Sequence, residues 1–302
     1  MDPRLAAVAA KQCGVFTSAQ AADAGYDAAQ VRVRLANGAW VRVRRGALTL
    51  RSTYDAAQAD RRSAHLLHAA AALVLTSYDA SLSHRSAAIA HGLPLIGRWP
   101  DVVALTFDRA HRRRAVGVEL HTARTPPHHR TVHSGMPVTT VARTVSDLAR
   151  SQPFAHALAA ADHALHTGVC SAADLWQVVR DCPVWPGIAR TKRVLEFADR
   201  RSESPGESLS RAAIVAAGLP APDLQVVLLV GTRQLRVDFM WPAQGLVGEF
   251  DGRVKYGATS DLWQEKQRED LIRRRYRVAR WTWADVHPTS DGLVRLLRPL
   301  LQ

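Results

Sequence analysis

Three carboxylates lie within one short stretch, RVDFMWPAQGLVGEFD, which runs from Arg236 to Asp251. Glu249 and Asp251 are two residues apart on a predicted strand, so their side chains share one face. Asp238 lies on the preceding predicted strand and joins them if the hairpin register aligns the two strands. Carboxylate oxygens are the ligands that hard divalent cations prefer. The spacing therefore predicts a site for Mg²⁺ or Mn²⁺, which could activate water and neutralise charge in phosphodiester hydrolysis.

Arginines close to these acids in the sequence give a second interpretation. The acids could be ordinary strand-end residues that form ion pairs with Arg233, Arg236 or Arg253. Three acids on adjacent strands would repel one another unless they shared a cation. Metal binding is therefore the preferred interpretation, and ion pairing is the alternative.

Periodicity and turn residues predict the elements that surround these acids. A helix starts at Ser204 or Gly206, carries Glu207 in its first turn and ends at Gly218. Three strands, a helix, a strand and a closing helix follow, over residues 224–230, 234–240, 246–251, 261–275, 276–281 and from about 290. The predicted order is αβββαβα, and Glu207 could complete the acidic site from the first helix.

This order resembles the restriction-endonuclease-like PD-(D/E)XK superfamily and is most similar to the branch allied to very-short-patch-repair endonucleases. The resemblance covers residues 203–302 and implies a fold that cleaves DNA with Mg²⁺. The residues that carry it are Glu207 in SPGES, Asp238 in VDF, Glu249 and Asp251 in GEFDG, and the ending RYRVARWTWADV.

The sequence departs from the superfamily pattern at one position. The superfamily places a lysine two residues after the second acid, where it orients water or stabilises developing charge, and that position is Asp251 in this chain. Lys255 or Lys266 could substitute, and Lys266 is preferred because a helix holds it more firmly. The catalytic residues that the resemblance implies are Glu207, Asp238, Glu249, Asp251 and Lys266.

The N-terminal residues predict a small DNA-binding unit. A first helix ends at Gly14, a second ends at Gly25, and Asp27 caps a third. A β-hairpin with glycine turns follows over residues 40–50. Two short helices joined by a glycine turn and followed by a hairpin are typical of a winged helix.

Polar and basic side chains on the third helix and the hairpin are candidates for contacts to DNA. The helix would enter the major groove, and the hairpin would lie beside the phosphates. The candidates are Gln30, Arg32 and Arg34 on the helix and Arg42, Arg44 and Arg45 on the hairpin. The alternative is a solvated basic face on a small helical domain.

The same stretch resembles the N-terminal winged-helix domain of the AbiE-type abortive-infection antitoxins. The resemblance lies in LAAVAAKQCGVFTSAQAADAGYDAAQVRVRLANGAWVRVRRGALTL and extends more loosely through HRSAAIAHGLP and PVTTVARTVSDLAR. It implies a DNA-facing fold and a toxin or other defence-system partner. It implies little about reaction chemistry, because these patterns are structural.

Four histidines, His121, His128, His129 and His133, surround a Pro-Pro pair in a predicted loop. They lack the H-x3-H spacing that places two ligands on one helix face, and no carboxylate is close to His128, His129 or His133 in the sequence. A metal site is therefore not expected there.

Composition favours a cytoplasmic protein with a polyanionic partner. The formal net charge is +13 and the sequence pI is near 10.7, mostly because of arginine, which favours DNA. The three cysteines form no CxxC pair, which fits a reducing compartment. Neither a signal-peptide pattern nor an apolar run of about 18 residues occurs, so no membrane partner is expected.

The predicted fold is multidomain and mixes α+β and α/β parts. A winged helix over residues 1–55 precedes a mainly helical middle region with a short β-hairpin over 56–202, and a restriction-endonuclease-like αβββαβα core covers 203–302. The first functional hypothesis is a metal-dependent DNA endonuclease with a winged-helix DNA-binding region and Mg²⁺ or Mn²⁺ as its cofactor. The alternative is a non-catalytic DNA-binding transcriptional regulator or antitoxin-like protein of a defence or toxin-antitoxin system.

Overall fold

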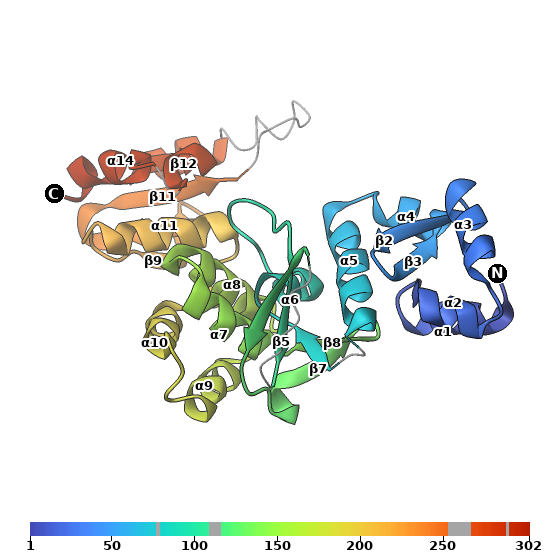
Figure 1. The fold of residues 1–302 in the computed structure, drawn as a ribbon. Helices are drawn as coiled ribbons and strands as arrows, with labels where there is room; N and C mark the ends of the chain where they lie inside the picture. The colour runs from blue at the N-terminus through green and yellow to red at the C-terminus, as the bar shows by residue number, and fades with distance from the viewer. Residues whose placement is uncertain (77–78, 109–115, 253–266, 288–289) are drawn as a thin grey trace. The chain divides into compact units, whose positions relative to one another are not determined.

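The chain folds into two compact units that mix helices and sheets. The computed structural model describes residues 1–76, 79–108, 116–252, 267–287 and 290–302. The first unit consists of residues 1–151 and 173–188, and the second of residues 152–172 and 189–302. Figure 1 labels many of the helices and strands of both units. In the described ranges, no helix combines the length and apolar character needed to cross a membrane. The domain boundaries expected near residues 55 and 202 stay predictions.

The N-terminal part of the first unit contains four helices and a three-stranded antiparallel sheet of order β1-β3-β2. The helices are α1 (Pro3–Lys11), α2 (Ser18–Asp23), α3 (Ala28–Ala36) and α4 (Arg51–Ala57). The strands are β1 (Val15–Thr17), β2 (Trp40–Arg44) and β3 (Ala47–Leu50). The three helices and the β2–β3 hairpin expected from the sequence are present at their expected places.

Capping side chains explain where α2 and α3 begin. Thr17 and Gln20 form a reciprocal capping box at α2, and Asp27 and Gln30 form another at α3. Gly25, between the two helices, has a φ of +90°, which a side chain would disfavour. A small apolar core closes this part of the unit, made of Leu5, Ala9, Phe16, Ala21, Trp40 and Leu48.

The remainder of the first unit is built on a five-stranded sheet of order β6-β5-β4-β8-β7. Its strands are β4 (Ala80–Leu82), β5 (Val103–Phe107), β6 (Val118–Thr122), β7 (Arg130–His133) and β8 (Met136–Thr139). The accompanying helices are α5 (Arg61–Leu75), α6 (His84–His91), α7 (Val141–Ser151), the short η1 (Pro127–His129) and α9 (Ala172–Asp181), of which all but the first residue belongs to this unit.

This sheet is larger than the sequence predicts. The sequence indicated two strands here, and it extended two helices over residues 81–82 and 137–139, which belong to β4 and β8. Ser134 and Gly135 both have positive φ, 49° and 79°, and form the tight turn between β7 and β8. Val138 pairs with Leu82 of β4 and with Thr131 of β7. Strand pairing across the sheet thus overrides a locally helical pattern.

The second unit contains a four-stranded sheet and several helices. Its strands are β9 (Asp223–Val230), β10 (Arg233–Trp241), β11 (Leu246–Asp251) and β12 (Arg277–Thr282). Its helices include α8 (Phe154–His166), α10 (Ile188–Phe197, in this unit from Ala189), α11 (Pro205–Ala216), α13 (Trp283–Val286) and α14 (Gly292–Leu301). Residues 267–273 are also helical, so the described residues follow the predicted order of elements.

The sheet of the second unit has the order β12-β11-β10-β9, with β11 and β12 parallel and the other neighbours antiparallel. Helix α11 packs closely on β11, because a Cβ at Gly206 would lie 2.0 Å from the ring of Phe250. The buried indole of Trp281 on β12 donates a hydrogen bond to the Ser210 hydroxyl, 2.7 Å away. These contacts bring the N-terminal turn of α11 to the strands that carry the predicted acids.

Candidate functional site

Four predicted acids line one cleft in the second unit. The cleft has a volume of about 660 Å³, and its lining includes Glu207, Asp238, Glu249 and Asp251. They come from α11, β10 and β11, three elements that the sequence predicted around the acids. Arg253, Lys255 and Lys266 lie outside the described residues.

Glu207 is buried and fully hydrogen-bonded in the first turn of α11. Its Oε1 accepts from the Ser204 hydroxyl at 2.7 Å. Its Oε2 accepts from the Glu203 backbone N–H and from the side-chain amide of Gln225, each at 3.0 Å. Ser204 also caps α11 by accepting from the Glu207 N–H. The SPGE sequence therefore fixes the Glu207 carboxylate at the helix start, where the helix dipole favours a negative charge.

Asp238 and Glu207 share a hydrogen-bond partner. Its Oδ2 accepts from the Phe250 backbone N–H at 3.0 Å, and its Oδ1 lies 3.5 Å from the side-chain amide nitrogen of Gln225. Burial raises the pKa of Asp238 to about 6, and the negative charges of Glu207 and Glu249 add to this effect. Carboxyl groups with such raised pKa values are common where a cation or a proton is bound.

Gln225 is a site residue that the sequence did not single out. Its amide donates to Glu207, and it is the residue between Leu224 and Val226, which pair with β10 on either side of Asp238. Its backbone has a φ of +53°, which is uncommon for a residue with a side chain. Strain of this kind is often retained at functional sites, where surrounding contacts hold it in place. The rare backbone conformation distinguishes this residue in the structure. A glutamine in a predicted strand does not indicate a site residue in the sequence.

Glu249 forms ion pairs with two arginines. Its carboxylate oxygens lie 2.7 Å from Arg268 Nη2 and 2.8 Å from Arg280 Nη2, and Arg280 also pairs with Glu269 at 3.1 Å. The alternative of ion pairing therefore holds for Glu249, although with partners other than those expected. Arg236, one of the expected partners, pairs with Glu203 instead.

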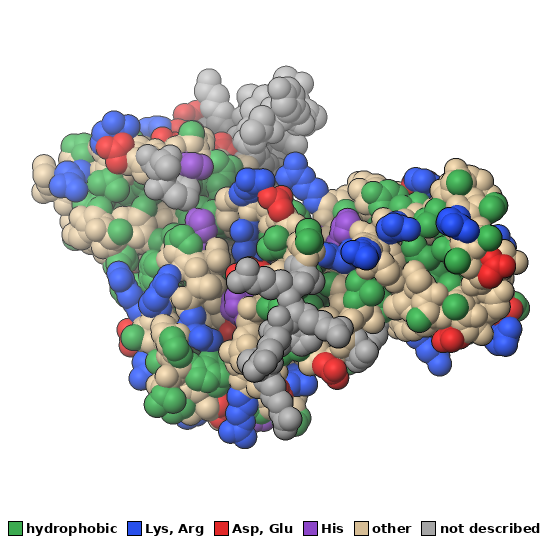
Figure 2. All heavy atoms as spheres, viewed as in Figure 1, with side chains coloured by type: hydrophobic (Ala, Val, Ile, Leu, Met, Phe, Trp, Pro, Cys, Tyr) green, Lys and Arg blue, Asp and Glu red, His purple; other side chains and the backbone are tan. Residues whose placement is uncertain are grey.

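The candidate DNA-contacting side chains of the first unit fall into two groups. Arg32, Arg42 and Arg45 are exposed. Arg34 is half-buried, and its guanidinium lies 4.7 Å from the ring centroid of Tyr26. Figure 2 shows Lys and Arg side chains on the surface of the N-terminal elements. Basic side chains are therefore available on both α3 and the β2–β3 hairpin.

Gln30 and Arg44 have structural partners. The side-chain oxygen of Gln30 accepts from the Asp27 N–H at 3.0 Å as part of the α3 capping box. Arg44 donates to the backbone oxygens of His68, Val116 and Gly117 at 3.1, 2.9 and 3.1 Å. Burial lowers the pKa of Arg44. These two residues position α3 and the hairpin, a role that spacing alone did not indicate.

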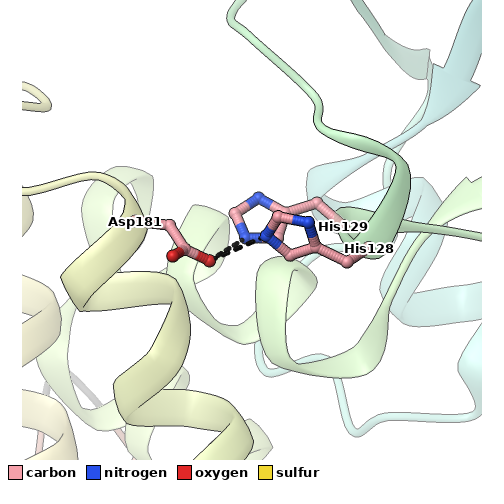
Figure 3. A group of neighbouring side chains, drawn as sticks. All are labelled: His128, His129 and Asp181. Carbon is pink, nitrogen blue, oxygen red and sulfur yellow. Dashed lines mark hydrogen bonds and ion pairs between the residues drawn. The ribbon is translucent and has the colours of Figure 1, made fainter.

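In the first unit, two of the four histidines that were expected in a loop lie beside a carboxylate. Figure 3 shows the rings of His128 and His129 pointing at Asp181, the last residue of α9. In the described part of the chain, these three side chains are the group of histidine, cysteine or acidic residues whose possible metal-ligand atoms all lie within 4.8 Å of one another. Partial burial opposes ionisation of Asp181, but hydrogen bonds from His128, Gln177 and His129 lower its pKa to about 2. Sequence reasoning missed Asp181, because it lies 52 residues beyond His129.

Comparisons with known proteins concern parts of the chain. Residues 3–50 match the family described as "Transcriptional regulator, AbiEi antitoxin". The uncharacterized proteins MT2308 and Rv2248, from two strains of Mycobacterium tuberculosis, are each 32% identical to this chain over 136 residues, which is 45% of the chain and 50% of either relative. The chain thus spans about half the length of these curated relatives.

One solved structure resembles the chain loosely. The crystal structure of the RV2827C protein from Mycobacterium tuberculosis has a TM-score of 0.40 and 14% sequence identity, over 65% of this chain and 80% of that one. The family match over residues 3–50 covers the N-terminal elements α1 to β3.

Proposed function

We propose that the protein is a DNA-binding transcriptional regulator of the AbiEi antitoxin type, with a winged helix at its N-terminus. The match to that family over residues 3–50 carries the proposal, because it coincides with α1 to β3. In this assignment α3 is the recognition helix and the β2–β3 hairpin is the wing. The partners are DNA and a toxin protein.

The charge distribution supports this assignment. Arg32 on α3 is exposed, as are Arg42 and Arg45 on the wing, so all three can reach phosphate oxygens without breaking an ion pair. Arg34 is held against Tyr26 and Trp40 at 4.7 and 5.5 Å, which orients its guanidinium on the same helix. Contacts of this kind position a protein on DNA, and side chains of the helix then contact base edges.

Charge reversal tests the winged helix. Binding is measured by fluorescence anisotropy on a duplex spanning the region upstream of the coding sequence, at several salt concentrations. We expect Arg32→Glu/Arg42→Glu to weaken binding at least roughly tenfold and to lower the salt slope by about two, since about two phosphate contacts are lost. The control Arg274→Glu/Arg298→Glu changes the charge equally at two exposed sites of the second unit. Equal losses in both variants, or no preference for this duplex over a scrambled one, would contradict the proposal.

A second candidate function is metal-dependent DNA cleavage by the second unit, which would then be a restriction-endonuclease-like domain. The observation that favours it is the shared cleft, in which Gln225 links Glu207 to Asp238 and Glu249 lies beside them. Asp238, Glu249 and Asp251 are the candidate ligands for Mg²⁺ or Mn²⁺, and Lys266 is the candidate general catalyst. Arg268 and Arg280 would have to release Glu249 or serve as phosphate contacts.

Cleavage assays distinguish the two candidates. The nuclease hypothesis predicts nicking of DNA with Mg²⁺ or Mn²⁺ that is lost in Asp238→Asn and in Glu249→Gln. Asp223→Asn, an exposed acid at the start of β9, is the matched control and should keep full activity. Absence of cleavage with either metal, together with intact DNA binding, would rule out the nuclease hypothesis and leave the regulator as the remaining candidate.

A further inference from the structure

A separate cluster of metal-binding side chains lies in the first unit, outside both sites described above. We propose that His128, His129 and Asp181 form a binding site for Zn²⁺ or a similar transition-metal ion. Both imidazole Nε2 atoms face the same carboxylate oxygen, Oδ2 of Asp181, at 2.9 Å from His128 and 3.0 Å from His129. Figure 3 shows this convergence of two rings on one carboxylate.

The distances from Asp181 Oδ2 to the two imidazole nitrogens are close to those in a tetrahedral zinc site. Zn²⁺ binds nitrogen and carboxylate oxygen at about 2.0–2.2 Å, which places neighbouring ligand atoms roughly 3.3 Å apart. The two distances to Oδ2 are shorter than this by a few tenths of an ångström. All three ligand atoms lie within 4.8 Å of one another, so an ion could draw the two imidazoles and the carboxylate together and replace their hydrogen bonds with metal bonds.

The backbone and a neighbouring side chain hold two of the ligands in place. The N–H of His129 donates to the Pro126 oxygen at 2.8 Å, and its own carbonyl oxygen accepts from the Thr140 N–H at 3.0 Å. The ring of His129 is 2% exposed, so packing restricts its orientation. The other oxygen of Asp181, Oδ1, accepts from the Gln177 side-chain amide at 2.8 Å. This second contact orients the carboxylate and leaves Oδ2 for the site.

His128, the third ligand, makes the site accessible to an ion from solvent. The side chain of His128 is 61% exposed, so the site opens to solvent. Three protein ligands leave a fourth position for water or another ligand. Two imidazole nitrogens favour Zn²⁺, Co²⁺ or Ni²⁺ over Mg²⁺ and Mn²⁺, which prefer all-oxygen sites. This site therefore differs in its metal from the acidic cleft of the second unit.

The ion would act as a structural cross-link. His128 and His129 belong to η1, which immediately precedes β7, and Asp181 ends α9. A bound ion would fasten α9 to η1 within the first unit by bonds stronger than the present hydrogen bonds. Because metal binding to a folded site adds to folding stability, the ion should raise the stability of this unit.

Metal titration of the untagged full chain tests the site. Zn²⁺ binding is measured by calorimetry, and Co²⁺ is added separately to follow the visible absorption of a tetrahedral site. We expect one ion per chain, and we expect His128→Ala and Asp181→Asn each to weaken binding roughly 100-fold. His128→Ala removes an exposed ring, and Asp181→Asn keeps the shape of the side chain. His133→Ala, which removes a nearby histidine outside the cluster, should bind as the parent does.

Two outcomes would overturn the proposal. One is the absence of stoichiometric Zn²⁺ or Co²⁺ binding to the folded parent chain, which would mean that the three side chains form only a hydrogen-bonded cluster. The other is equal affinity in the parent, His128→Ala and Asp181→Asn, which would place the ion elsewhere. Neither readout depends on DNA binding or cleavage, so failure here is separate from failure of the proposed function.

Discussion

At the scale of single residues, Asp238 shows how a cleft changes the chemistry of an acid. Its pKa is raised from 3.8 to about 6, first because burial disfavours the charged form. The unfolded chain releases the proton near pH 4, whereas the folded chain retains it until about pH 6. Asp238 therefore favours folding fully below pH 3.8, and this contribution is lost as the pH rises through 6.

Asp238→Asn should remove this pH dependence, because asparagine carries no titrating proton. We expect the variant to gain about 2 kcal/mol in unfolding free energy relative to the parent between pH 4 and pH 7, with EDTA present to exclude metals. Urea unfolding at four pH values measures it. Asp223→Asn, at an exposed acid, should stay parallel to the parent. A difference between Asp238→Asn and the parent that does not change with pH would refute the raised pKa.

At the scale of elements, the contact between α11 and β11 depends on the absence of a side chain at Gly206. A Cβ there would lie 2.0 Å from two ring atoms of Phe250, so one of the two elements must shift. Gly206→Ala should therefore destabilise the second unit by about 1–3 kcal/mol. The shift would also move Glu207, the next residue, away from Asp238.

A double variant tests the cause of this loss. Phe250→Leu shortens the side chain opposite Gly206, so Gly206→Ala should cost less in that background than in the parent. The measurement is a double-mutant cycle of unfolding free energies. Simple additivity of the two changes would show that the clash is not the source of the destabilisation.

Elements were predictable from the sequence to the extent that local residues define them. Asp27 and Ser204 cap their helices as expected, and the order of strands from β9 to β12 follows from apolar runs and turns. Strand β8 was misassigned as helix, because its pairing with β4 and β7 lies outside the local pattern. The Ser134-Gly135 turn was the one local signal for that hairpin.

The residues of the candidate sites were predictable where they are close in sequence or where a family resemblance names them, as it does for Glu207. The acids of β10 and β11 were found because they lie in one hairpin. Asp181 was missed because it lies 52 residues after His129 in the sequence. The two arginines that form ion pairs with Glu249 lie 19 and 31 residues after it. Spacing predicted the position of Arg44 on the hairpin but not the backbone oxygens to which it donates, and its contact to DNA stays a prediction.

At the scale of the whole molecule, buried groups in the two compact units should make opposite contributions to stability in acid. Burial lowers the pKa of His65 and of His84 in the first unit to about 4, from 6.5. The unfolded chain takes up these protons near pH 6.5 and the folded chain does not. This unit therefore keeps the full contribution above pH 6.5 and loses it as the pH falls to 4, whereas the second unit gains stability over the same range through Asp238.

Scanning calorimetry of the full chain between pH 7.5 and 4.5 measures this contrast. We expect the separation between two unfolding transitions to change with pH, and His65→Gln to make the transition of the first unit less sensitive to acid. His166→Gln, at an exposed histidine of the second unit, is the control. Parallel shifts of all transitions would contradict the opposite signs.

The three hydrogen bonds of Arg44 have a mechanical consequence. They join the end of β2 to the backbone at His68 of α5 and at Val116 and Gly117 next to β6. Hydrogen bonds to three backbone oxygens restrict rotation of the β2–β3 hairpin relative to α5 and β6. Under the proposed function, a force that DNA exerts on this hairpin would pass to α5 and to the edge of the five-stranded sheet. If the hairpin is the wing of the proposed function, the angle at which it meets DNA is set by α5 and the five-stranded sheet of the first unit.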